Sequence, residues 1–310
     1  MVGVIECLPH FVASSISAVK VLNMHFNKRN FSKLFQLVAR QWQQLKFNDE
    51  LNVLEEVVMQ GNRMAHCYRN TLVSFMVLFL LLPLISPILD IVHPINGTRT
   101  RQQLLRVNYI FFNDDDYFFY IYLQLFWSSV VVVFTIVGAD WLYMLIIHHG
   151  SGLFAVCGHR VQKATVNPNN FIGESVSEDY TYEKIRNCAI MHNEAIRFSD
   201  ILKESSQSSY LIQIGLNMLG ISASAVQVKT IFKMITNIKN SFRQIIVYII
   251  LQTVISLDRP EEAIRSAVFC GACQFHLLLL SLPGQVLLDH CSDLADNMYV
   301  FRMYSYKLYI

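Results

Sequence analysis

Two long, uncharged apolar segments constrain this chain more than any other feature. They are TLVSFMVLFLLLPLISPIL at Thr71–Leu89 and YFFYIYLQLFWSSVVVVFTIVGA at Tyr117–Ala139. A helix needs about 20 mostly apolar residues to cross the hydrocarbon core of a bilayer, and both segments reach that length. Charged residues make up 15% of the chain, against about 25% in soluble domains. We therefore expect two firm membrane crossings.

Four further segments have weaker crossing character. Ser205–Val228 is uncharged but rich in serine and glycine, which suit close helix contacts. Ser266–Leu288 is long enough despite one histidine, whereas Gln244–Leu257 is nearer to a half-crossing. Val2–Met24 is interrupted by two charged residues. Together the segments predict an all-α, polytopic helical membrane protein.

The basic residues indicate an orientation in the membrane. Residues 23–70 hold seven lysines and arginines, whereas residues 90–116 hold three, which places the first stretch in the cytoplasm. Asn96 begins an Asn-Gly-Thr sequon in the second stretch, so we expect Asn96 to be glycosylated outside. Four basic residues within 229–243 do not fit this scheme.

Two polar stretches carry apolar residues at helical spacing. In residues 31–69 and 160–204 these residues recur at the spacing of one helix face. They are Leu34, Phe35, Val38, Leu51, Leu54, Val57 and Val58 in the first stretch, and Ile185, Cys188, Ala189, His192, Ala195, Ile196 and Ile201 in the second. The run Asn167–Asn170 marks a turn before the second helix. We expect long cytoplasmic helical extensions that pack on each other.

No catalytic constellation is apparent. The sequence lacks the GxSxG, HExxH and P-loop motifs, so we expect no enzyme activity. The adjacent pair His148–His149 and the Cys270–Cys273 pair lack further ligands at metal-binding spacing, so we expect no metal and no cofactor. The net charge of +2 provides no field to attract nucleic acid.

An aromatic cluster opens the second crossing. Tyr120, Gln124 and Trp127 share one helix face, and Phe119 and Tyr122 lie on a neighbouring face. A mostly apolar cavity with one or two polar contacts would bind small, volatile, lipophilic molecules. We take these five residues as candidate ligand-binding residues. The alternative is ordinary helix packing or lipid contact.

Two motifs resemble the insect odorant receptor family. In Ile185–Val228, Cys188 and His192 precede the segment Arg197–Asp200, which leads into an apolar helix as it does in that family. In Phe275–Tyr299 the matching residues are Gly284, Gln285, Leu287, Ser292, Leu294, Ala295 and Tyr299. The resemblance spans nearly the whole chain.

The resemblance implies a fold and a function. Such receptors have seven helices, a cytoplasmic N-terminus and a plasma-membrane location, and they form with a co-receptor a hetero-tetrameric, odorant-gated cation channel. Their ligand pocket lies in the outer half of the helices, which corresponds here to Tyr120, Gln124 and Trp127. Residues 185–203 would belong to the cytoplasmic anchor.

The chain also departs from the family pattern. No segment of this chain resembles the family's first helix or most of its seventh. Tyr304–Tyr306 resembles the end of that seventh helix. The segment LDRPEEAIRS, Leu257–Ser266, looks like an insertion. We therefore expect one part at residues 1–256, with helices two to five and the start of helix six, and another at 257–310. We expect a partial receptor that does not conduct alone.

Two other functions remain alternatives. A gustatory receptor has similar architecture, although Tyr304–Tyr306 favours the odorant family. A membrane transporter would show internal repeats and charged or broken helices at mid-membrane. The two firm crossings contain no charge, and the Leu257–Ser266 break is the best support for a transporter.

Overall fold

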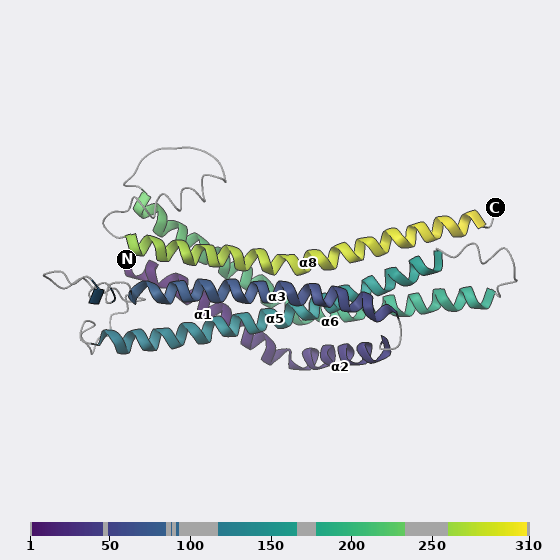
Figure 1. The fold of residues 1–310 in the computed structure, drawn as a ribbon, viewed down its shortest axis with the longest axis horizontal. Coiled ribbons are helices and arrows are strands. Elements are labelled where there is room, and N and C mark those ends of the chain that lie inside the picture. The colour runs from purple at the N-terminus through teal and green to yellow at the C-terminus, as the bar shows by residue number, and fades with distance from the viewer. Residues whose placement is uncertain are drawn as a thin grey trace. The chain divides into compact units, whose positions relative to one another are not determined.

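The fold is entirely helical in the residues that the computed structural model describes, which are 2–45, 49–84, 88, 91–92, 117–165, 178–232 and 260–308. This part of the chain forms six α-helices and one 3₁₀ helix, and it contains no strand (Figure 1). The elements are α1 (Val2–Phe26), α2 (Lys28–Leu45), α3 (Glu50–Leu81), η1 (Leu82–Leu84), α5 (Phe118–Thr165), α6 (Glu178–Phe232) and α8 (Pro260–Leu308). The predicted all-α class is confirmed.

Among the described residues, three helical segments are long and apolar enough to cross a membrane. They are Glu50–Leu84, Phe118–Lys163 and Ala267–Tyr299. They contain residues 71–84, 118–139 and 267–288 of the crossings that we expected at 71–89, 117–139 and 266–288, and each extends further into polar sequence. A bilayer core requires about 20 helical residues, so the remaining length of α5 continues beyond the membrane. The polytopic membrane architecture is confirmed.

Proline chemistry sets the end of α3 and the start of α8. The α-helical pattern of α3 stops at Leu81, and the next three residues, which include Pro83, form the tighter helix η1. Proline has no N–H for the helical ladder and clashes with the preceding turn. Pro260 is the first residue of α8, a position where the missing N–H costs nothing.

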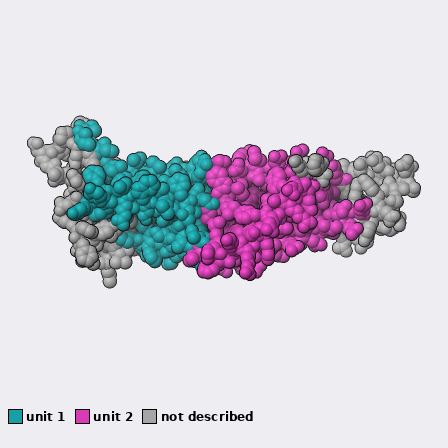
Figure 2. Space-filling view, turned by 90° about the horizontal axis from the view of Figure 1, so that it is seen from below, with its two compact units in different colours: residues 1–21, 68–138, 209–278 teal, residues 22–67, 139–208, 279–310 magenta. Residues whose placement is uncertain are grey.

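The residues group into two compact units, and the same long helices contribute to both. Unit 1 comprises residues 1–21, 68–138 and 209–278, and unit 2 comprises residues 22–67, 139–208 and 279–310 (Figure 2). The boundary that we expected between residues 256 and 257 lies outside the described residues, as do Asn96 and the Asn167–Asn170 turn.

Unit 2 contains the extensions that the spacing predicted. Leu34 of α2, Leu54 of α3 and Ala195 of α6 are fully or almost fully buried. Close packing joins α3 to α5, because a Cβ atom on Gly152 would come within 2.5 Å of Leu54 Cδ1. Three residues depart from the prediction, because Phe35 is 46% exposed, Ile196 is 40% exposed and Ala189 is also exposed. The buried positions of Leu34, Leu54, Val57 and Ala195 confirm that these helices pack on each other.

The C-terminal part of the chain is a single helix. α8 runs without interruption from Pro260 to Leu308 and so includes Tyr304–Tyr306. The aromatic tail that resembles the end of a seventh helix is thus continuous with the Phe275–Tyr299 motif (Figure 1).

Candidate functional site

Unit 1 contains a partly open cavity of about 190 Å³. Side chains from α1, α3, α5, α6 and α8 line it, so residues far apart in sequence meet there. Most of the lining is apolar, and its larger members include Leu72, Phe75, Met76, Phe79, Leu125 and Phe269. Such a lining favours an apolar occupant, because burying apolar surface is favourable wherever water is displaced.

A few polar side chains interrupt this apolar lining. They are His10, Ser14, Ser128, Ser129, Asn217 and His276, together with the thiol of Cys273. His276 Nδ1 lies 2.8 Å from the Tyr68 hydroxyl, which ties α8 to α3. The Asn217 amide donates to the backbone carbonyl of Gln213 at 2.9 Å. These bonds fix the polar groups in place, which is the arrangement of a pocket that orients its ligand.

A buried lysine lies in the same unit. Lys20 of α1 donates through Nζ to Gln213 Oε1 at 2.5 Å, and the Gln213 amide donates to Ser209 Oγ at 2.7 Å. Lys20 is almost completely buried. Intramembrane charges are rare and usually functional. In the sequence, Lys20 counted only as an interruption of the crossing expected at Val2–Met24. No sequence pattern indicated that Lys20 would pair with Gln213 of α6.

The five sequence-predicted ligand residues do not line this cavity. Cavity-lining residues of α5 include Leu125, Ser128, Ser129, Val132, Val133 and Ile136, which form a different face. Phe119, Tyr120 and Trp127 are between 59% and 74% exposed, and Gln124 is also exposed. Tyr122 is partly buried, and its hydroxyl donates to the Leu80 carbonyl at 2.9 Å. Ligand contact by these five residues stays a prediction.

The histidine pair and the cysteine pair lie in helix packing. His149 Nε2 lies 2.8 Å from Gln41 Oε1 in unit 2, and the neighbouring His148 Nδ1 lies 2.8 Å from the Met144 carbonyl. Cys270 and Cys273 are both buried. Within the described ranges, no three His, Cys, Asp or Glu side chains are grouped to hold a metal ion.

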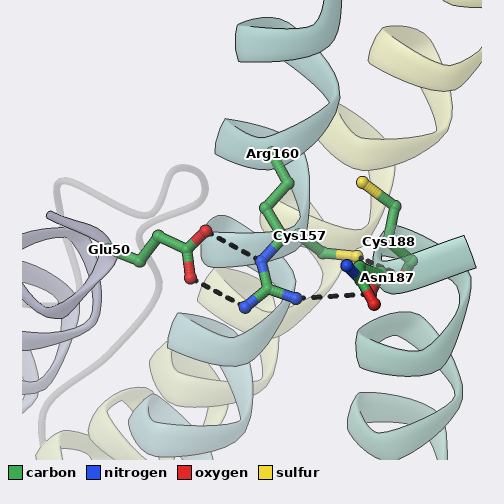
Figure 3. Close-up of polar contacts among 5 residues, drawn as sticks. All are labelled: Glu50, Cys157, Arg160, Asn187 and Cys188. Carbon is green, nitrogen blue, oxygen red and sulfur yellow. Dashed lines mark hydrogen bonds and ion pairs between the residues drawn. The ribbon is translucent and has the colours of Figure 1, made fainter. Parts of the chain in front are cut away.

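An ionic contact joins three helices of unit 2 (Figure 3). Arg160 of α5 donates from Nε and Nη2 to the two carboxylate oxygens of Glu50, at 2.9 and 2.7 Å. Its Nη1 donates to the carbonyl of Asn187 at 3.3 Å, and Cys157 Sγ donates to the carbonyl of Cys188 at 3.5 Å. A bidentate arginine–carboxylate pair adds geometric specificity to its strength, so this contact fixes the register of α3, α5 and α6. It resembles a structural contact more than a binding site.

Comparison with known proteins identifies the family. A comparison with curated proteins gave no match. The family model described as 7tm odorant receptor matches residues 1–257, which is most of the chain. This range includes the Ile185–Val228 motif and ends before Phe275–Tyr299. The match also agrees with the three membrane-capable helices and with a receptor rather than an enzyme. The chain belongs to the odorant receptor family.

Proposed function

We propose that this receptor chain binds small, volatile, apolar molecules in the unit 1 cavity, and that it forms with a co-receptor subunit an odorant-gated cation channel in the plasma membrane. The cavity is the observation that carries the ligand-binding part of the proposal. It lies among helices of a receptor family and is lined mainly by apolar side chains. The hetero-tetramer and the channel rest on the family resemblance.

The size of the cavity favours small ligands. Pockets for drug-sized molecules occupy about 300–1,000 Å³, whereas this cavity measures about 190 Å³. A cavity of about 150 Å³ lined by aliphatic and aromatic side chains accommodates benzene. The volume therefore suits a single ring or a short aliphatic chain. Asn217 and the Ser128–Ser129 pair offer the hydrogen bonds that would distinguish an alcohol or ketone from a hydrocarbon.

The two possible ligand positions on α5 can be separated by mutation. Val132 lines the cavity, whereas its neighbour Val131 is exposed. We expect Val132→Phe to fill part of the cavity, and Val131→Phe makes the same chemical change outside it. Tyr120→Ala tests the exposed face that the sequence predicted.

The readout is the rise in melting temperature of the purified full chain with a panel of odorants, because a ligand that binds only the folded state stabilises it. We expect odorants to stabilise the wild type and Val131→Phe but not Val132→Phe. Stabilisation that survives Val132→Phe and disappears in Tyr120→Ala would place the ligand on the exposed face instead.

A further inference from the structure

The junction of α1 and α2 in unit 2 combines exposed phenylalanines with basic residues. Only Asn27 separates the two helices, and it accepts and donates helix-like backbone hydrogen bonds, from Phe31 N and to Asn23 O. Phe26 is 77% exposed and Phe35 is 46% exposed. Contact with an apolar partner at this junction would remove the surface of these two aromatic side chains from water, which is favourable.

The basic residues form a one-sign patch. Lys28, Arg29 and Lys33 are all exposed and lie within two turns of the junction. No aspartate or glutamate occurs between residues 23 and 48. Phe31 and Leu34 of α2 are buried against the rest of the unit. The patch is therefore complementary to a negatively charged partner, and its apolar neighbours require that this partner also be apolar.

A groove connects the two kinds of side chain. It is an open surface groove of about 510 Å³ between α1 and α2. Met24, Phe31, Phe35 and Ala39 form apolar walls, and Lys28, Ser32 and Gln36 add polar groups along one side. Lys28 and Ser32 are one helical turn apart, so both can donate hydrogen bonds to one phosphate group.

Chain geometry places this junction at the depth of lipid headgroups. The Phe31 ring packs edge-to-face on the Tyr143 ring of α5, with centroids 5.6 Å apart. Tyr143 is four residues beyond Ala139, where we expect the α5 crossing to end. Four helical residues span about 6 Å, and the headgroup layer extends roughly 5–8 Å beyond each side of the hydrocarbon core. Residues 23–70 are also the stretch that we expect in the cytoplasm, where the leaflet is rich in anionic lipid.

We propose that the α1–α2 junction is a binding site for an anionic phospholipid of the cytoplasmic leaflet. Lys28 and Ser32 hold the headgroup phosphate in the groove, Lys33 adds positive charge beside it, and Met24 and Phe35 contact the first carbons of the acyl chains. The site is independent of the odorant cavity, because all of its residues belong to unit 2.

Photolabelling of the full chain in nanodiscs tests this site. The probes are phosphatidylserine and phosphatidylcholine that carry the same photoactivatable group near the headgroup, and labelled peptides are mapped by mass spectrometry. We expect phosphatidylserine to label residues 22–36 about tenfold more than phosphatidylcholine does, and this preference to fall with rising salt. Added glycerophosphoserine, the free headgroup, should not compete.

The variants separate the proposed site from general charge effects. Lys28→Gln with Lys33→Gln removes two cations from the site and should reduce phosphatidylserine labelling to the phosphatidylcholine level. Arg40→Gln removes an exposed cation from the same helix, twelve residues or about 18 Å beyond Lys28, and should leave the labelling unchanged. All three side chains are exposed, so we expect unchanged melting temperatures.

Three results would overturn the proposal. Equal labelling by the two lipids would mean that the junction touches lipid without recognising its charge. Competition by glycerophosphoserine would indicate a soluble phosphate ligand, and cross-linking of α2 to a second copy of the chain would indicate a protein partner.

Discussion

Gly61 of α3 is the position where one added methyl group should disturb unit 2 most. A Cβ atom built on Gly61 would lie 2.3 Å from His148 Cγ, 2.6 Å from His148 Cβ and 2.7 Å from His148 Nδ1. The His148 ring is fully buried, and its Nδ1 lies 2.8 Å from the Met144 carbonyl, so the ring cannot rotate away without losing that contact. His148 Cβ is attached directly to the backbone, and α3 and α5 must therefore move apart.

The expected cost follows from two opposing terms. Overpacking of this kind costs about 1–3 kcal/mol, and the rigid neighbour favours the upper end. Alanine within a helix is about 1 kcal/mol more favourable than glycine. We expect Gly61→Ala to destabilise the chain by about 2 kcal/mol, measured as a lower melting temperature of the purified protein.

A matched control isolates the contact with His148. Gly138 of α5 has no heavy atom within 4 Å of the position of an added Cβ. Gly138→Ala should therefore keep or raise the melting temperature. The double change Gly61→Ala with His148→Ala removes two of the three close contacts and should recover part of the loss. If Gly61→Ala were as stable as wild type, the close approach of α3 to α5 would be wrong.

Three further predictions concern other contacts. Arg160→Ala removes the bidentate pair with Glu50 and should destabilise the chain by about 2 kcal/mol in thermal unfolding. Lys163→Ala removes a mostly exposed ion pair and should change the stability little. Equal losses of stability in the two variants would contradict this prediction. Tyr68→Phe removes the contact to His276 and should cost about 1 kcal/mol; an unchanged melting temperature would argue against the bond. Burial raises the pKa of the Cys188 thiol, so less of it is thiolate near neutral pH. Iodoacetamide should alkylate Cys188 more slowly than a cysteine in a short peptide, with a difference that narrows as pH rises, and equal rates would show that Cys188 is not buried.

The helices were predictable from sequence because their patterns are local. The uncharged run at 117–139 requires a helix in lipid, and the spacing of Leu54, Val57 and their neighbours requires one beyond it. Both predictions hold in α5 and α3. The family was predictable because the Ile185–Val228 motif lies inside the range that the family model matches.

The position of the cavity was not predictable in the same way. Whether Trp127 or Ser128 faces a cavity depends on the rotation of α5 against its neighbours, and a rotation of one residue, about 100°, changes the answer. The aromatic side chains of α5 predicted a pocket on one face, but the lining on α5 is made of serines and aliphatic residues on another face. The hydrogen bond between Lys20 and Gln213 joins residues 193 positions apart, and no local sequence pattern predicts it.

Odorant-evoked current tests most directly whether the unit 1 cavity binds the ligands that open the channel. The chain would be expressed with its co-receptor, and the current would be compared with that of the co-receptor alone, with surface labelling to confirm that the chain is present. We expect new odorant responses that Val132→Phe removes and Val131→Phe retains. The proposal would be wrong if the chain reached the surface and added no response to any odorant. It would also be wrong if Val132→Phe left the responses unchanged.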